Sequence, residues 1–192
     1  MINKAMLRTM MHSPVRNYVV PGLTSWLIGE PSPKGTMRFF ECSRDHQENI
    51  TPHSHRFDFQ CWVLAGRVRN KVWTPSYGGG DYFTRTNLIY GGAVGQYEKV
   101  RIGVCGWGFT ETDYAKDDWY SMEAKEVHSI EFSKGAEVLF FEGPAIAGQS
   151  MILEPWVDGE DVPTFEVKPW MFKRPAQFSQ VAPVGAEGSS SG

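Results

Sequence analysis

The sequence has little cysteine, no large excess of either charge and no long apolar run, and each shortage excludes a class of protein. Its three cysteines, Cys42, Cys61 and Cys105, form no Cys-x-x-Cys pair, and an odd number does not build a disulfide framework. The formal net charge is −3 over 192 residues, so bulk nucleic-acid binding is not expected. No apolar run reaches the length of a membrane span, and we therefore expect no membrane partner.

The N-terminal region also lacks the apolar core of a secretory signal, because Lys4 and Arg8 interrupt its only apolar cluster. We instead expect one short helix over residues 4–11, ended by Ser13-Pro14. Without a leader or a membrane span, the sequence predicts a cytoplasmic protein.

Aromatic residues make up 14% of the chain, and there are 20 glycines. Turn signals recur at roughly 8–12-residue spacing and no long helical period is present, which favours many short strands. We predict an all-β fold, a double-stranded β-helix (jelly-roll) barrel with a short N-terminal helix. Residues 1–174 are expected to form this single domain. Beyond them the composition shifts to Gln, Ala, Pro, Gly and Ser, so we expect 175–192 to be a disordered tail.

The most informative stretch runs from residue 52 to residue 66. His53 and His55 stand one residue apart at its start, and on an extended chain such residues point to the same face. Both imidazoles can then converge on one point, as a metal site requires. Apolar residues continue that face, and a glycine permits the turn into the next strand: Phe57, Phe59, Cys61, Val63 and Gly66.

A third histidine, His128, stands at the head of another apolar stripe in the segment 126–143. We predict that this segment forms a hairpin of two strands joined by a turn that contains glycine. A lone histidine there is more often a packing residue, but together with His53 and His55 it becomes the obvious third ligand. His12 and His46 lie in polar surroundings and are not expected to bind metal.

The stretch resembles the first motif of the cupin family, in which His-x-His is followed by a glutamate and, after about six residues, a glycine. His53, His55 and Gly66 match that motif, while Gln60 or Phe59 stands where the glutamate is usual. His128 corresponds to the single histidine of the second motif, without the Pro-x-Gly before it or the Asn after it. The variant is similar to a small branch of phage and bacterial cupins of unassigned role.

The resemblance implies a jelly-roll barrel with a divalent metal bound inside it. With no glutamate, the site would be a neutral face of three histidines, similar to that of the thiol dioxygenases within the cupin family. Fe(II) is the favoured metal, and Zn, Mn or Ni also suit imidazole ligands. A neutral face keeps the 2+ charge of the metal, which favours an anionic ligand.

Three functions follow from this interpretation. The leading one is a dioxygenase-like oxidation of a small polar or anionic molecule at non-haem iron. The second is a non-redox isomerase or lyase in which the metal acts as a Lewis acid. The third is a module that binds a small molecule, such as a nucleotide signal, without turnover.

Several polar side chains on the surrounding strands are candidates for contact with such a ligand. Strand alternation points Asp58 away from His55, so we expect Asp58 not to bind the metal directly. The many Trp, Phe and Met residues exceed what one small barrel can bury, so we also expect a homodimer. The substrate-contact candidates are Gln60, Arg69, Tyr82, Arg101 and Tyr120.

Overall fold

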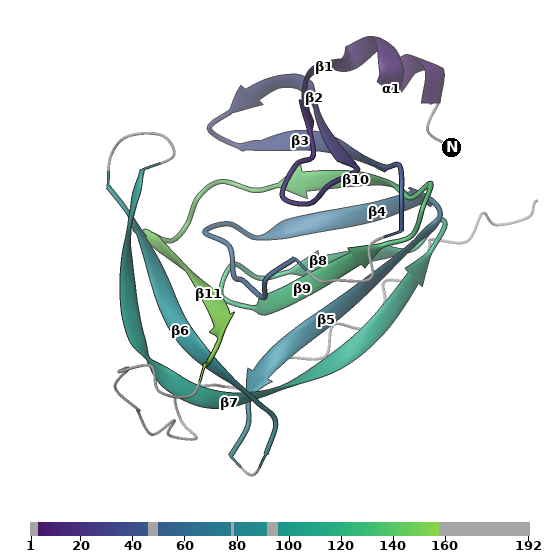
Figure 1. Cartoon of the computed structure of the whole chain (residues 1–192). Coiled ribbons are helices and arrows are strands. Elements are labelled where there is room, and N and C mark those ends of the chain that lie inside the picture. Colours follow the sequence, from purple (N-terminus) through teal and green to yellow (C-terminus); the bar gives the residue numbers. More distant parts are fainter. Residues whose placement is uncertain (1–3, 46–49, 78, 92–95, 158–192) are drawn as a thin grey trace, which may run out of the picture.

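Two curled antiparallel sheets make up the computed structural model, which describes residues 4–45, 50–77, 79–91 and 96–157 (Figure 1). A short helix α1, Lys4–Met10, precedes them. The first sheet has the order β1 (Met11–Arg16), β2 (Leu23–Ser32), β3 (Gly35–Cys42), β10 (Glu137–Glu142), β4 (Phe59–Ala65), β8 (Trp119–Met122). The second has the order β11 (Gln149–Pro155), β6 (Asp81–Tyr90), β7 (Tyr97–Ala115), β5 (Arg67–Pro75), β9 (Val127–Phe132).

The chain crosses between the sheets in the manner of a jelly roll, which confirms the predicted fold class. After β3 it passes through the short segment 52–55, whose residue His53 bridges both His128 of β9 and Ile152 of β11. It then continues to β4 in the first sheet, β5, β6 and β7 in the second, β8 in the first, β9 in the second, β10 in the first and β11 in the second. This alternation over two packed sheets is the double Greek-key pattern.

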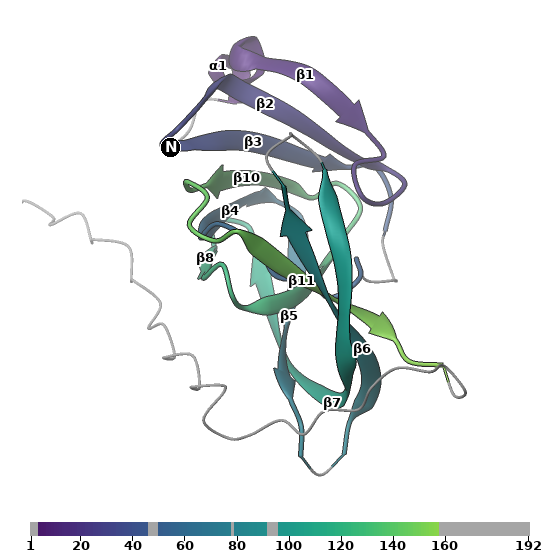
Figure 2. The same cartoon turned by 90° about the vertical axis from the view of Figure 1, so that its left-hand side faces the viewer.

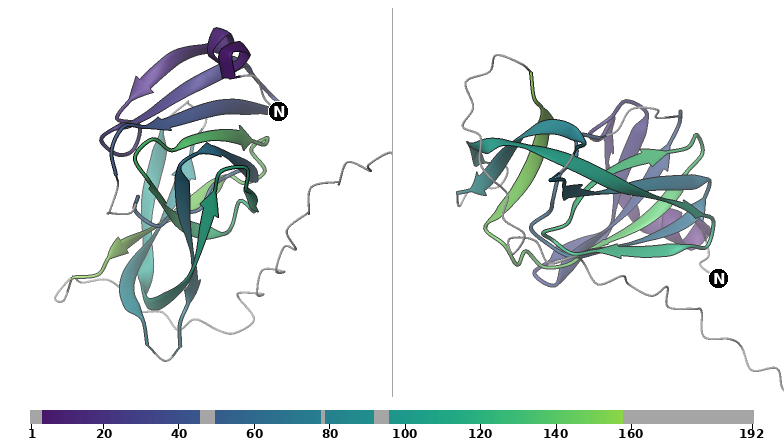
Figure 3. Two further views of the ribbon diagram at one scale, coloured as in Figure 1. Left: turned by 90° about the vertical axis from the view of Figure 1, so that its right-hand side faces the viewer. Right: turned by 90° about the horizontal axis from the view of Figure 1, so that it is seen from below.

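The strands β6 and β7 extend the second sheet away from the first (Figure 2). The long strand β7, drawn in teal, pairs with β6 through its first half and with β5 through its second half (Figure 3). Glycines and polar residues interrupt the apolar alternation in this region, so its strand pattern is weak in the sequence.

The predicted hairpin over 126–143 is wrong in its pairing, although both of its strands form. β9 pairs with β5 in the second sheet, while β10 inserts between β3 and β4 in the first. Each strand carries apolar residues that need burial between the sheets, including Ile130 of β9 and Val138 of β10. The turn at 133–136 therefore crosses from one sheet to the other, a pairing that local sequence does not specify.

The main core lies between the two sheets, where Phe40, Phe59, Val63, Ile130 and Phe140 pack together. A second apolar cluster lies on the outer face of the first sheet, where Leu7 of α1 covers part of it. No helix within the described residues is long and apolar enough to cross a membrane. The expected domain end at residue 174 and the tail 175–192 lie outside the described residues.

Candidate metal centre

The three histidines singled out in the sequence lie side by side inside the barrel. The backbones of His53 and His128 exchange two hydrogen bonds, each 2.9 Å long. The backbone N–H of His55 donates to the carbonyl of Ala124 at 2.9 Å, which ties the same segment to the loop before β9. These backbone hydrogen bonds therefore fix the main-chain positions from which all three imidazoles project.

The rings face one another closely. Nε2 of His55 lies 3.0 Å from Nε2 of His128, and one nitrogen of each of the three rings lies within 4.8 Å of the others. The ring centroids are 4.7 Å apart for His53 and His55, and 5.0 Å apart for His53 and His128. Among the described residues this is the group of histidine, cysteine or carboxylate side chains that could hold a metal ion.

Two of the rings are oriented by hydrogen bonds on the side away from the cluster. Nδ1 of His53 donates to the carbonyl oxygen of Thr51 at 2.8 Å, and Nδ1 of His128 donates to Oδ1 of Asn70 at 2.8 Å. A proton held on Nδ1 leaves Nε2 of a neutral imidazole with its lone pair available. Such outer hydrogen bonds typically fix the tautomer and orientation of metal-binding histidines.

An apolar wall stands where a carboxylate ligand is usual in the first cupin motif. The ring of Phe59 lies 4.8 Å from that of His55 and 5.3 Å from that of His128, while Phe57 lies 5.1 Å from His55. Phe59, not Gln60, therefore faces the histidines. The cluster is thus a donor set of three imidazoles with aromatic side chains behind it.

Burial keeps these imidazoles neutral. It lowers the pKa of His53, although the Thr51 carbonyl partly offsets that effect. Burial, aided by the neighbouring His53, lowers the pKa of His55 to about 3. The pKa of His128 is held well below its usual value, first by burial and then by His53 and His55. Because a metal binds the neutral ring, these shifts favour metal binding near neutral pH.

The donor set fits a divalent first-row metal. Two nitrogens that bind one ion at about 2.1 Å and at right angles lie about 3.0 Å apart, as do those of His55 and His128. Three protein ligands also leave coordination positions for water or substrate. The chemistry of the residues present thus agrees with a bound Fe, Mn, Zn or Ni ion and does not select among them.

A pocket of about 460 Å³ opens beside the cluster. His55 forms part of its wall, and β6 and β11 supply further lining residues. The loop 123–125 and residues 146–147 complete it. Its polar and ionisable lining residues are Ser54, His55, Asp58, Arg85, Asn87, Glu123, Lys125, Gln149 and Ser150.

The five residues predicted to contact a substrate lie elsewhere, and none of them is among the described residues that line this pocket. Gln60 is exposed on the outer face of the first sheet, opposite Phe141 and Ser121. Tyr120 is buried in the core between the sheets and stacks on Tyr114 at 4.4 Å. Strand alternation places every second residue on the opposite face, and Gln60 lies on the face away from the histidines.

Tyr82 is on β6, which lines the pocket, and Arg101 is on the neighbouring strand β7, but both lie on the face of the second sheet away from the pocket. Tyr82 is exposed and packs against Trp156 at 6.2 Å. Arg101 is exposed and pairs in register with Thr86, one residue away from Arg85. The pocket-facing set on β6 is therefore the alternate one, which contains Arg85 and Asn87.

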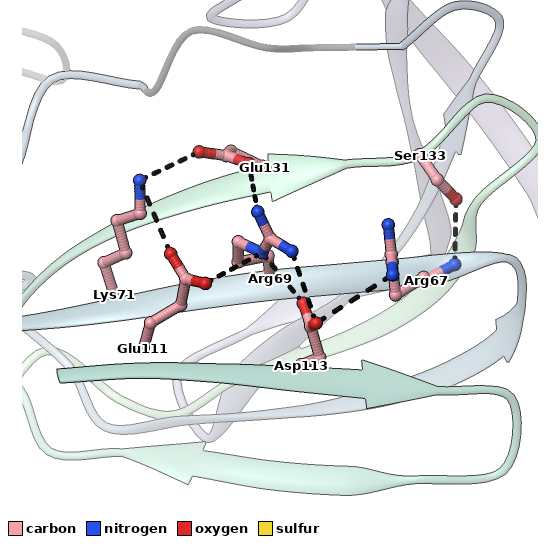
Figure 4. A network of polar contacts seen from close by, with 7 residues as sticks. All are labelled: Arg67, Arg69, Lys71, Glu111, Asp113, Glu131 and Ser133. Atoms are coloured by element: carbon pink, nitrogen blue, oxygen red, sulfur yellow. Dashed lines mark hydrogen bonds and ion pairs between the residues drawn. The ribbon is translucent and has the colours of Figure 1, made fainter.

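Arg69 takes part in an ion-pair network on the outer face of the second sheet (Figure 4). Its Nε lies 2.9 Å from Oδ1 of Asp113 and 3.2 Å from Oε1 of Glu111. Lys71 joins the network through Glu131 at 3.1 Å. The basic side chains on β5 pair with acidic side chains on β7 and β9. Arg69 is therefore held by ion pairs on the outer surface of the sheet.

Our sequence analysis missed Asn70, Arg85 and Asn87. Asn70 alternates with Val68 and Val72 along β5, and a polar residue on the buried face of a strand signals a specific partner. Arg85 and Asn87 likewise follow Phe83 at two-residue intervals along β6. Their significance depends on knowing that β6 exists and which of its faces points inward.

Comparison with known proteins gives no match to a family model and none to a curated protein. Among solved structures, a variant of oxalate decarboxylase from Bacillus subtilis has a TM-score of 0.44 and 12% identity, covering 71% of this chain and 28% of that one. KdgF from Halomonas sp. has a TM-score of 0.39 and 14% identity, covering 74% and 92%.

Hydroxypropylphosphonic acid epoxidase from S. wedmorenis has a TM-score of 0.41 and 12% identity, covering 68% of this chain and 54% of that one. This chain therefore spans only about a quarter to a half of oxalate decarboxylase and of the epoxidase. Similarity of this degree transfers neither an activity nor a residue role.

The fold and the site, taken from the chain itself, define a jelly-roll protein with three histidines gathered inside the barrel. This combination supports the cupin resemblance found in the sequence. The three-histidine group is one that could bind a divalent metal.

Proposed function

We propose that this protein is a cytoplasmic metal-dependent enzyme that oxidises a small polar or anionic molecule. The observation that carries the proposal is the arrangement of His53, His55 and His128, whose ring nitrogens converge beside an open pocket. A divalent ion bound there would supply Lewis acidity and, if it is iron, the means to activate dioxygen. In a dioxygenase-type reaction both atoms of O2 enter the substrate, which itself supplies the electrons.

The residues of the chain have separable roles in this proposal. His53, His55 and His128 hold the ion, while Asn70 and the Thr51 carbonyl keep two of the rings correctly oriented. Phe57 and Phe59 exclude water from one side, which strengthens electrostatic interactions in the site. The pocket beside His55 admits the substrate from the other side.

The test is anaerobic reconstitution with Fe(II), followed by addition of candidate thiols and small acids and measurement of O2 uptake. We expect one bound iron per chain and uptake with at least one candidate. His53→Ala should lose both bound iron and uptake, and His12→Ala, a histidine outside the cluster, should lose neither.

Two other outcomes would change the assignment. Zinc or nickel in protein purified without added metal, with turnover that needs no O2, would indicate the isomerase or lyase. A metal-free pocket that retains a bound metabolite, with no uptake for any candidate, would indicate the binding module.

A further inference from the structure

Arg85 is a half-buried cation in the wall of the pocket beside the histidines. It lies in the middle of β6, where alternate residues face inward: Phe83 belongs to a buried apolar cluster, Arg85 follows, and Asn87 comes next. The inward face of β6 thus carries, at alternate positions, an apolar side chain, then a cation and then an amide. Both Arg85 and Asn87 line the pocket that His55 also lines.

The strand β7 on one side of Arg85 leaves room for its side chain. Its register partner on β7 is Gly103, which has no side chain, and the β6–β7 pairing is shifted by a bulge between Arg85 and Thr86. Bulges commonly redirect a side chain next to a binding site. On β11 the partner is Leu153, which is fully buried, so that side is fixed by packing.

The acidic residues of the lining hold the neighbouring loop in place. Oδ1 of Asp58 accepts a hydrogen bond from the backbone N–H of Ala124 at 2.8 Å. Glu123 pairs with Lys125 at 2.9 Å. These contacts shape the wall next to His55, whose own N–H bonds to the carbonyl of Ala124. The polar groups that β6 and β11 contribute to the pocket lining are Arg85, Asn87, Gln149 and Ser150.

The charge and size of the pocket together select a class of ligand. A guanidinium presents paired N–H donors that match a carboxylate, and partial burial strengthens that interaction. Burial is the main effect on the pKa of Arg85 and lowers it, against an opposing effect of Cys105, and a bound anion would favour the charged form. The volume of about 460 Å³ suits a small molecule and not a polymer.

We propose that the ligand is a small organic acid whose carboxylate is bound by Arg85, with a second polar group held by Asn87 and Gln149. This inference rests on the proposed function, because it identifies the substrate class for the pocket beside the three histidines. Arg85 acts as a positioning and specificity residue: it fixes one end of the acid so that the other end reaches His55.

The test is isothermal titration calorimetry with a panel of carboxylic acids of one to six carbons, including hydroxy, amino and dicarboxylic acids, each paired with its neutral amide. Protein is used both loaded with Mn(II) and stripped with chelator, and metal content is measured on the same samples. We expect the wild-type chain to bind at least one acid and not the corresponding amide. Arg85→Gln should weaken that binding about 10- to 100-fold, as expected for loss of a charge-assisted pair.

Two further variants separate recognition from a purely structural role. Arg85→Lys keeps the charge but loses the paired donors, so its affinity should lie between those of the wild type and Arg85→Gln. Arg101→Gln removes an exposed arginine from the other face of the same sheet and should leave affinity unchanged. All variants should keep the wild-type circular dichroism spectrum and melting temperature.

The outcomes also distinguish this inference from the proposed function. Bound metal with equal acid affinity in the wild type and Arg85→Gln, or with no acid bound by the wild type, would overturn the role of Arg85 and leave the metal site standing. Acid binding that depends on Arg85 in a chain that takes up no metal would support the inference while rejecting the metal-dependent function.

Discussion

Asn70 is the residue through which the orientation of a metal ligand can be tested without removing that ligand. Its Oδ1 accepts a hydrogen bond from the N–H at Nδ1 of His128, and its amide N–H donates to the sulfur of Met122 at 3.4 Å. It is almost completely buried on β5, so no water replaces it easily. Asn70 thus sets both the tautomer and the direction of the His128 ring.

We predict that Asn70→Leu weakens metal binding about 10- to 100-fold, because the His128 ring loses the acceptor that orients it. Asn70→Asp, which keeps an acceptor oxygen of the same reach, should bind metal more tightly than Asn70→Leu. Competition with a chelator of known affinity measures both. Wild-type affinity in Asn70→Leu, with an unchanged melting temperature, would show that His128 needs no such partner.

At the scale of the element, the β4–β5 turn joins the strand facing the histidine cluster to the strand that carries Asn70. Gly66 adopts a φ of +68°, and an added Cβ would lie 2.7 Å from Cα of Ala136 and 2.9 Å from its nitrogen. Those contacts are with backbone atoms, which cannot move aside cheaply. The glycine that matches the cupin motif is thus required by the crossing of the chain near the β9–β10 turn.

Gly66→Ala is therefore expected to lower the free energy of unfolding by about 1–3 kcal/mol, through left-handed backbone strain and the contact with Ala136. Gly148→Ala serves as the control, because no other atom lies within 4 Å of the position of its Cβ. Urea denaturation at equal protein concentration compares the two. Equal midpoints for the two variants would contradict the steric argument.

For the whole molecule, the three clustered histidines predict a dependence of stability on pH. Their pKa values are lowered from 6.5 in the folded chain, for His55 to about 3. Below pH 6.5 the unfolded chain therefore binds protons that the folded chain does not. The free energy of unfolding should fall as the pH drops from 6.5 toward 3, by up to about 1.4 kcal/mol per pH unit for each histidine.

Urea unfolding of the metal-free protein at several pH values measures this slope. His55→Gln should reduce it by about the contribution of one proton. The difference between variant and wild type isolates the histidine from the carboxylates that also titrate in this range. The same slope in His55→Gln and in the wild type would mean that His55 is protonated in the folded state.

Self-association is the other prediction at this scale, and it concerns the outer face of the first sheet. Trp119, 48% exposed, stacks on Trp62 at 4.8 Å and on Phe141 at 5.8 Å. α1 covers part of this face through Leu7. We propose that a second copy covers the aromatic part in a two-fold dimer. Light scattering at micromolar concentration should give twice the chain mass, Trp119→Gln should give a smaller mass, and a monomeric wild type would reject the dimer.

The sequence by itself determined the features that depend on local periodicity. Alternation placed His53 and His55 on one face, turn residues and aromatic content indicated an all-β jelly roll, and an apolar stripe marked the strand that carries His128. Each of these follows from a two-residue period or from a glycine at a turn, which are properties of neighbouring residues. The residues they identified lie together in the folded chain.

Tertiary structure alone decided how the strands pair and which faces point inward. It put β9 and β10 in different sheets and placed Phe59, not Gln60, beside the histidines. Of the three arginines considered, Arg85 lines the pocket, and Arg69 and Arg101 do not. These outcomes depend on contacts between residues far apart in the chain, and a shift of one residue in register exchanges the two faces of a strand. Hence the histidines could be found from their spacing, whereas Asn70 and Arg85 became visible only once β5 and β6 had their partners.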